Sequence, residues 1–323
     1  MRPAALLPAA LVVLGARAAL TPATRPAATP APPREGYVVA ADSTRLYYRV
    51  EGSGHDTIIA VHGGPGVDLE SIRADFAPLT RAHVVVFYDQ RGTGRSTLPA
   101  DTTRLSATTQ ISDLDAVRRH FGLARVALVA HSYGPLLAAT YALAHPAAVS
   151  RMVFFGGVPP RRGDYEQAYE RTMNAHLDST QRARLADAGR RLADPAADAR
   201  QACRDYWAVA LRPRLAEPDR TLPLLRSDLC TADGRAIRYG LTVTNPTVMA
   251  TYGDWDLRPG LRTLDTPTLV VHGEADAIPL ENVREWAAVM PHARLVPVPN
   301  AGHFAYAERP DVVWPVVLRF LAR

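Results

Sequence analysis

The clearest chemical signal in the sequence is Ser132, which follows an apolar strand and precedes a helix. Residues 125–130 form a buried-strand run, and residues 133–144 are the small and apolar residues of a packed helix. A serine on a sharp strand-to-helix turn presents its hydroxyl above the edge of a sheet, where it can act as a nucleophile. Such a turn needs small residues two positions before and after the serine, and Ala130 and Gly134 fill these positions. Alanine replaces the more usual glycine at position 130, and it is the smallest residue with a side chain.

A serine hydroxyl becomes a good nucleophile only when a histidine takes its proton and a third group orients that histidine. The expected chain order is Ser, then Asp or Glu, then His. Asp276 follows the strand predicted at 268–272, and His303 follows the strand predicted at 294–298. Catalytic groups in open α/β sheets gather outside the carboxyl ends of the strands. We therefore predict Ser132 as nucleophile, His303 as general base and Asp276 as the orienting carboxylate.

Two backbone amides are expected to stabilise the negative charge that develops during acyl transfer. The helix after Ser132 directs its free N–H groups toward the serine, so the amide of Tyr133 is one predicted donor. The run of residues 62–66, His-Gly-Gly-Pro-Gly, follows an earlier strand, and its glycines let the backbone approach a substrate closely. We assign the amide of Gly64 as the second donor, with Gly63 as the fallback and a substrate contact. An ordinary Gly/Pro turn would explain the glycines but not their position at this sheet edge.

Other residues near these motifs have simpler interpretations. His62 and His131 flank the motifs and are expected to shape the loops, and Glu274 is the alternative acid to Asp276. The glycine-rich loop at 89–96 matches neither G-x-G-x-x-G nor a following Gly-Lys-Ser/Thr. It is expected to brace the oxyanion loop rather than to bind a nucleotide. Cysteine and histidine are not clustered at ligand spacing, so no metal site is predicted.

The motifs are embedded in alternating strand and helix patterns. This alternation predicts an α/β fold with a mostly parallel central sheet and helices on both faces. Strands are expected at residues 46–50, 57–61, 82–88, 125–130, 149–155, 268–272 and 294–298, and helices at 69–79, 108–121, 133–144, 280–289 and 312–321.

The alternation breaks after Gly156-Gly157. Residues 158–255 have a helical, charged and Arg-rich pattern with no buried-strand run, so we predict a helical cap inserted between core segments 37–157 and 256–323. Cys203 and Cys230 both fall in the cap. They form either a disulfide, in an oxidising compartment, or two buried free thiols.

The N-terminus has the pattern of an export signal. Arg2 precedes an apolar run at 4–14 and the small residues Ala16-Arg17-Ala18, which predicts a signal peptide over 1–18. The run is shorter than the about 20 residues that span a bilayer. A Pro- and Ala-rich linker is predicted at 19–36. We expect a periplasmic or extracellular protein, with an uncleaved membrane anchor as the alternative. No cysteine follows the run, so a lipid anchor is not expected.

The composition fits a globular enzyme. Of 323 residues, 47% are hydrophobic and 21% are charged, which excludes a disordered chain and a polytopic membrane protein. The formal net charge of +5 comes from scattered arginines, and the sequence contains no lysine. Without a basic run, neither a nucleic-acid partner nor membrane contact beyond export is predicted. The expected partner is a small-molecule or short-peptide substrate, and the sequence does not predict an oligomeric state.

The His-Gly-Gly-Pro-Gly run, the loop Asp-Gln-Arg-Gly-Thr-Gly-Arg-Ser at 89–96, and Ser132, Asp276 and His303 together resemble the proline iminopeptidase branch of the α/β-hydrolases. The resemblance extends from about residue 37 to residue 323. It implies an α/β-hydrolase fold with an inserted cap, and a hydrolase without a cofactor that releases an N-terminal residue, often proline, from peptides or amides.

The cap departs from that branch at the residues that would bind the substrate's amine. Members have a Trp-Glu pair whose acid holds the free amine, whereas the nearest match here, around Trp207, lacks the acid. Asp164, Glu166 or Glu170 could supply a carboxylate, or they could be exposed surface residues.

Three functions follow from these patterns. The first is an exported serine aminopeptidase that forms an acyl-enzyme on Ser132. The second is an esterase or lactonase that uses the same residues on a small acyl ester. The third is a binding protein that keeps the fold without catalysis, and the complete set of catalytic residues speaks against it.

Overall fold

The computed structural model describes residues 34–323. The predicted signal peptide and the linker up to residue 33 lie outside the described residues. The linker was expected to reach residue 36, but Arg34 to Gly36 pair with residues 48–50 as the start of the first strand. None of the helices formed by residues 34–323 is both long enough and apolar enough to cross a membrane.

The described chain is built on an eight-stranded sheet with the order β1-β2-β4-β3-β5-β6-β7-β8. β1 and β2 pair antiparallel, β2 pairs antiparallel with β4, and the pairings from β4 to β8 are parallel. The predicted α/β class with a mostly parallel sheet is therefore confirmed, and β1 is an additional strand. The strands are β1 Arg34–Val39, β2 Arg45–Glu51, β3 Thr57–Val61, β4 Val84–Tyr88, β5 Val126–His131, β6 Val149–Phe155, β7 Thr268–Gly273 and β8 Ala293–Val298.

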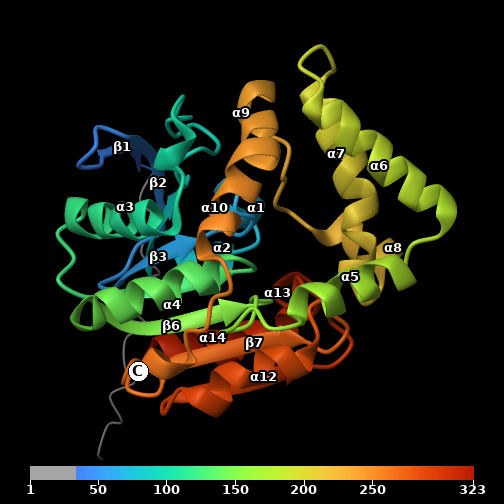
Figure 1. The fold of residues 1–323 in the computed structure, drawn as a ribbon. Helices are drawn as coiled ribbons and strands as arrows, with labels where there is room; N and C mark the ends of the chain where they lie inside the picture. The colour runs from blue at the N-terminus through green and yellow to red at the C-terminus, as the bar shows by residue number, and fades with distance from the viewer. Residues whose placement is uncertain (1–33) are drawn as a thin grey trace, which may run out of the picture.

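Helices cover both faces of the sheet, which explains why its central strands are apolar throughout (Figure 1). Successive strand residues point to opposite faces, so Leu128 packs into one hydrophobic cluster and Val129 into the other. The cluster around Leu128 includes residues of α3, α4 and α12, and the cluster around Val129 includes residues of α13 and α14. The core helices are α1 Glu70–Arg73, α2 Ala77–Thr80, α3 Ala107–His120, α4 Gly134–Ala144, α12 Leu280–Val289, α13 Ala305–Glu308 and α14 Pro310–Leu321.

The helix predicted over residues 69–79 is two short helices, α1 and α2. Pro78 is the reason, because proline lacks the N–H that would continue the hydrogen-bond ladder and its ring clashes with the preceding turn. Pro78 is tolerated in the first turn of α2, where that N–H has no intrahelical partner.

The segment between β6 and β7 contributes no strand to the sheet and forms the helical cap. Figure 1 shows α5 to α8 as a lobe beside the sheet, with α9 and α10 rising separately above α4. The helices of this segment are α5 Tyr165–Ala175, α6 Ser179–Ala193, α7 Ala199–Ala210, α8 Pro218–Thr221, α9 Gly234–Tyr239, the π-helix Gly240–Thr244, α10 Asn245–Tyr252 and α11 Arg258–Leu261. A short 3-10 turn, Arg212–Arg214, joins α7 to α8.

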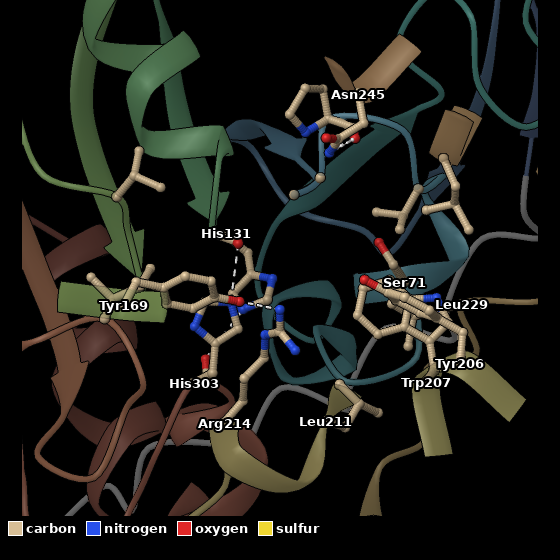
Figure 2. A pocket seen from close by; sticks show the side chains of 18 of the residues that line it. Ser71, His131, Tyr169, Tyr206, Trp207, Leu211, Arg214, Leu229, Asn245 and His303 are labelled. Carbon is tan, nitrogen blue, oxygen red and sulfur yellow. Dashed lines mark hydrogen bonds between the residues drawn. The ribbon is translucent and has the colours of Figure 1, made fainter. Parts of the chain in front are cut away.

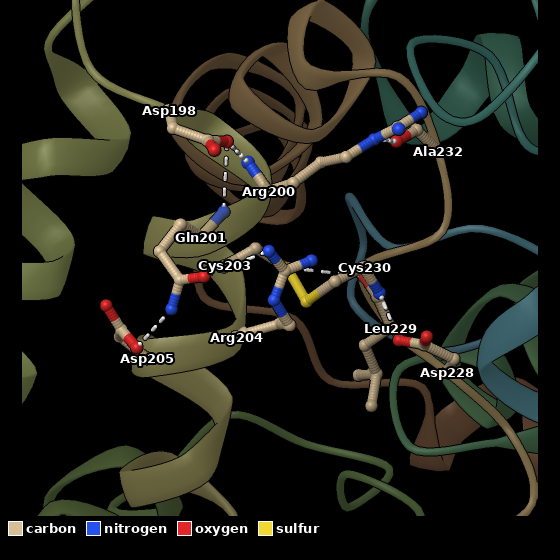
Figure 3. The surroundings of a disulfide bond; sticks show 10 residues. All are labelled: Asp198, Arg200, Gln201, Cys203, Arg204, Asp205, Asp228, Leu229, Cys230 and Ala232. Atoms are coloured by element: carbon tan, nitrogen blue, oxygen red, sulfur yellow. Dashed lines mark hydrogen bonds between the residues drawn. A yellow bond between two sulfur atoms is a disulfide. The ribbon is translucent and has the colours of Figure 1, made fainter.

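A disulfide between Cys203 and Cys230 links α7 to the segment that precedes α9 (Figure 3). Both residues belong to a small buried cluster with Leu192, Ala202 and Ile237. Of the two alternatives left by the sequence, the structure therefore has the disulfide.

Replacing both cysteines by serine should lower the free energy of unfolding by about 3 kcal/mol, because a cross-link over this length of chain restricts the unfolded state. Urea unfolding of the two proteins at equal concentration measures the difference. Reducing agent should shift the midpoint of the native protein and leave that of the variant unchanged. A reductant effect on the variant would contradict the assignment of the effect to this bond.

Candidate active site

Ser132 lies on the sharp turn between β5 and α4. Its backbone has a positive φ of 61°, a conformation that non-glycine residues rarely adopt and that is held here by a hydrogen bond from its N–H to the carbonyl of Phe155 (2.9 Å). A Cβ at Gly134 would stand 2.5 Å from the carbonyl oxygen of Val61, which accounts for glycine at that position. The same Cβ would stand 3.2 Å from the methyl group of Ala130, so glycine at 134 leaves room for alanine at 130.

The structure brings the side chains of Ser132, His303 and Asp276 together. Nε2 of His303 lies 3.0 Å from Oγ of Ser132, and Nδ1 of His303 lies 2.9 Å from Oδ2 of Asp276. The second carboxylate oxygen of Asp276 accepts the N–H of Ile278 (3.0 Å). This is the hydrogen-bonded order that an activated serine requires.

The surroundings of Asp276 keep it ionised. Burial acts to raise the pKa of its carboxyl, but the charges of His303 and His272, together with the hydrogen bonds it accepts, lower the pKa below its usual value. Nδ1 of His272 lies 3.7 Å from the same carboxylate oxygen that meets His303. The alternative acid, Glu274, is exposed.

The loop that carries His303 is held by hydrogen bonds from the core and the cap, and it packs closely against Gly156. The carboxylate of Glu308 accepts the N–H groups of Gly302 (2.9 Å) and Phe304 (3.3 Å), on either side of the histidine. The N–H of His303 itself donates to the carbonyl of Arg214 in the cap (2.7 Å). At Gly156, where φ is 51°, a Cβ would stand 3.0 Å from Nδ1 of His303. The imidazole is thus oriented from both the core and the cap.

The predicted oxyanion donors lie beside Ser132. Within residues 34–323, the N–H groups of Gly64 and Tyr133 donate to no protein group, and Gly64 lines the same cavity as Ser132. The role of the two amides as oxyanion donors stays a prediction. Gly63 is packed against the nucleophile, since a Cβ there would stand 2.8 Å from Cβ of Ser132. The side chain of Asn245, at the start of α10, donates to the carbonyl of Pro65 (2.6 Å) and ties this loop to the cap.

The loop at 89–96 braces the oxyanion loop, as the sequence predicted. The N–H of Gln90 donates to Nε2 of His62 (3.1 Å), and its side-chain amide donates to the carbonyl of the same histidine (2.9 Å). Oδ1 of Asp89 accepts the N–H of Leu69 (2.8 Å). The loop is itself held by a buried bidentate ion pair of Arg91 with a carboxylate of α3.

His62 and His131 are buried and uncharged at neutral pH. Burial lowers the pKa of His62 to about 4 and that of His131 to about 3, where the charge of His303 contributes as well. The ring of His131 stands 4.8 Å from that of His303, centroid to centroid. Both residues therefore support the loops, as expected, and His303 is the histidine in contact with the nucleophile.

A cavity of about 410 Å³ opens above Ser132, between the sheet edge and the cap (Figure 2). Ser132, His303, Gly63 and Gly64 form its floor, and aromatic residues of the cap, including Trp207, form part of its wall. A volume of this size suits a small-molecule substrate.

The predicted substrate-binding residues divide into two groups. Gly63 and Trp207 line the cavity. Asp164, Glu166 and Glu170 do not, so of the two alternatives left by the sequence, this structure favours surface residues over a carboxylate that holds a substrate's amine. Asp164 and Glu170 are exposed, and Glu166 pairs with Arg162 (2.7 Å). Helix α5 turns these carboxylates away from the cavity and presents Tyr165 and Tyr169 to it.

Sequence reasoning missed Arg214 and Asn245, which enter the site from the cap. Neither residue stands in a recognisable motif, because their roles depend on how the cap folds over the sheet. The proline-flanked Asn245-Pro246 pair was the one local signal, since it marks a helix start.

No group of three or more His, Cys, Asp or Glu side chains suited to a metal ion occurs in residues 34–323. Independently of that finding, a serine, a histidine and a carboxylate in hydrogen-bonded order beside backbone amides are suited to acyl transfer.

Comparison with known proteins places this chain in a family. Residues 56–310 match the model of the alpha/beta hydrolase fold family. A proline iminopeptidase of Xylella fastidiosa (strain 9a5c) is 27% identical over 295 residues, which cover 85% of this chain and 92% of that protein. The crystal structure of the Mycobacterium smegmatis proline iminopeptidase superposes with a TM-score of 0.67 at 22% identity, covering 90% and 98% of the two chains. An esterase from Rhodococcus sp. ECU1013 gives a TM-score of 0.65 at 22% identity, covering 89% and 98%. The chain therefore belongs to the α/β-hydrolase fold family and is similar to its proline iminopeptidase branch.

Proposed function

We propose that the protein is a serine hydrolase that forms an acyl-enzyme on Ser132. The observation that carries this proposal is the continuous hydrogen-bonded chain from Ser132 through His303 to Asp276, with distances of 3.0 and 2.9 Å, at the floor of a cavity.

The geometry supports the usual two-step reaction. Nε2 of His303 takes the proton of Ser132 as Oγ attacks the substrate's carbonyl carbon. The amides of Gly64 and Tyr133 donate to the oxygen that becomes negative, and His303 then gives its proton to the leaving group. A water molecule, deprotonated by the same imidazole, releases the acyl group from Ser132. Asp276 holds the imidazole in the tautomer that both steps require.

The cavity favours an acyl ester over an amide with a free N-terminal amine. An ammonium group taken from water into a cavity needs an anionic or strongly accepting partner. No Asp or Glu is among the described residues that line this cavity. An uncharged acyl ester has no such requirement.

An aminopeptidase acting on prolyl or other aminoacyl amides is the second candidate. The similarity to proteins named proline iminopeptidase supports it, at 25 to 27% identity over most of the chain. Among the described lining residues, oxygen acceptors and the faces of the aromatic rings would then have to bind the amine.

Two assays on the purified protein test the proposal. A fluorophosphonate probe should label Ser132, and failure of folded protein to label would favour a non-catalytic binding protein. Turnover of 4-nitrophenyl esters should then exceed turnover of proline 2-naphthylamide by at least about a hundredfold in kcat/KM. Faster cleavage of the naphthylamide would reverse the order of the two candidates.

We further propose that the protein is exported. The signal-peptide pattern over residues 1–18 and a disulfide in the cap support an oxidising location outside the cytoplasm. Mass spectrometry of the N-terminus after expression with its own leader tests this: a chain that begins at Ala19 is expected, and retention of Met1 would indicate an uncleaved anchor.

A further inference from the structure

The charge of the cavity is concentrated on one side chain. Among the described residues that line the cavity, Arg214 is the only one whose side chain is charged at all working pH values. The remaining wall consists of apolar, aromatic and small neutral polar residues. Arg214 is therefore the one permanent charge that a substrate meets on the described cavity wall, and the ionised Asp276 lies behind His303.

Arg214 is fixed close to the reacting groups through its backbone. Its carbonyl accepts the N–H of His303 (2.7 Å), and a Cβ at Gly302 would stand 2.2 Å from that carbonyl oxygen. The cap residue is thus held directly against the loop of the general base. In Figure 2 the side chain of Arg214 extends into the cavity and reaches the hydroxyl of Tyr169.

The guanidinium has donors to spare. It donates to the hydroxyl of Tyr169 and to the carbonyl of Ala210, and a guanidinium has more N–H groups than these contacts use. Burial raises the pKa of the Tyr169 hydroxyl despite the nearby charge of Arg214, so the tyrosine is neutral and does not form an ion pair with the arginine. The guanidinium also lies over the rings of Tyr169 (5.4 Å) and Trp207 (5.8 Å), which leaves its N–H groups at the ring edge for a ligand.

No carboxylate of residues 34–323 lies within ion-pair distance of Arg214. The contrast with Arg212, on the same 3-10 turn, is direct: its guanidinium pairs with Asp219 (2.9 Å) and lies outside the cavity. An arginine that faces a partly enclosed cavity without an acidic partner is suited to bind an anion that arrives with the substrate, and its planar donors match a carboxylate.

We infer that Arg214 binds a carboxylate carried by the substrate, so that the natural substrates are acyl compounds with a free carboxylate, such as half-esters of dicarboxylic acids. This inference rests on the proposed serine hydrolase function. It assigns a carboxylate to the substrate and requires no positive charge, whereas every N-terminal aminopeptidase substrate brings a free amine.

Matched substrates separate charge from shape. The 4-nitrophenyl half-ester of adipic acid is compared with the 4-nitrophenyl ester of adipamic acid, in which a neutral carboxamide replaces the carboxylate. A second pair, 4-butyryloxybenzoate and 4-butyryloxybenzamide, places the same groups on the leaving side. The native protein should prefer the carboxylate by about tenfold or more in kcat/KM in at least one pair, as a charge-assisted hydrogen bond provides.

The variants R214Q and R212Q provide the matched comparison. R214Q should reduce the carboxylate-to-carboxamide ratio to near one, whereas R212Q should leave it unchanged. R214K should keep part of the ratio, because it retains the charge without the planar donors. The ratio is the informative quantity, since a purely structural loss would lower both members of a pair equally.

The inference is overturned if the native protein shows no carboxylate preference in either pair, or if the preference survives R214Q. Failure of the serine hydrolase function is recognised separately, by absence of fluorophosphonate labelling and of neutral ester hydrolysis. If the protein is labelled and hydrolyses the neutral esters but shows no preference for the carboxylate, the serine hydrolase function stands and the proposed role of Arg214 is wrong.

Discussion

Replacing Ser132 by alanine should lower kcat by about a million-fold, because the acyl-enzyme can no longer form and the remaining groups act only through binding and the oxyanion hole. The side chain of Ser132 loses one oxygen and keeps its Cβ, so the turn and its positive φ of 61° are expected to persist. Steady-state hydrolysis of a neutral nitrophenyl ester measures the loss, and thermal unfolding establishes that the fold is intact.

Ser71 provides a control within the same cavity. It lines the cavity wall, and its hydroxyl donates to the carbonyl of Asp68 (2.5 Å) rather than to a histidine. Ser71→Ala should therefore retain kcat within a few-fold and label normally with a fluorophosphonate. If Ser132→Ala kept substantial turnover or labelling while Ser71→Ala lost them, the nucleophile would be misassigned.

The strands and the residues at their ends could be predicted because they depend on local patterns. The apolar run of β5 followed by Ser132, and the loops that carry Asp276 and His303 after β7 and β8, are each readable within about ten residues of sequence. The parallel arrangement then places their ends at one edge of the sheet. Ser132, Asp276 and His303 are distant in the sequence, but the order and direction of the strands bring them together. Their convergence can therefore be predicted without knowing how the side chains pack.

The contributions of the cap could not be predicted in the same way. Arg214 reaches the site because its carbonyl accepts the N–H of His303. The two residues are far apart in the sequence, so no local pattern predicts this contact. The sequence offers the acidic residues at and near the start of α5 for substrate binding, but tertiary packing decides which side of a helix faces a cavity. Tyr165 and Tyr169 take that side, and Glu166 pairs instead with Arg162.

Support for the general base was also missed. Glu308 holds both neighbours of His303 through their N–H groups, and burial raises the pKa of its carboxyl in spite of those hydrogen bonds. A lone glutamate in the sequence gives no indication of such a role. The role of Glu308 becomes visible only in the folded structure, where the loop that carries His303 packs against its carboxylate.

Replacing Asp276 by asparagine should lower kcat by about ten-thousand-fold with little change in the fold. Oδ2 of Asp276 accepts a hydrogen bond from Nδ1–H of His303, which leaves Nε2 without a proton and able to take one from Ser132. Oδ1 accepts the N–H of Ile278, so an asparagine would direct its oxygen there and its NH₂ group toward the imidazole. The histidine would then hold its proton on Nε2 and could not act as the base.

Glu274→Gln is the matched comparison, because Glu274 is the other acid in the same loop and its side chain is exposed. Its kcat should stay within a few-fold of the native value. The rate of fluorophosphonate labelling should fall in Asp276→Asn in parallel with kcat, since labelling requires the same deprotonation of Ser132. Normal labelling and normal turnover in Asp276→Asn, with a loss in Glu274→Gln, would move the carboxylate's role to Glu274. Equal and modest effects of both changes would mean that His303 is oriented by Glu308 and the Arg214 carbonyl alone, and that the buried charge of Asp276 adds nothing to catalysis.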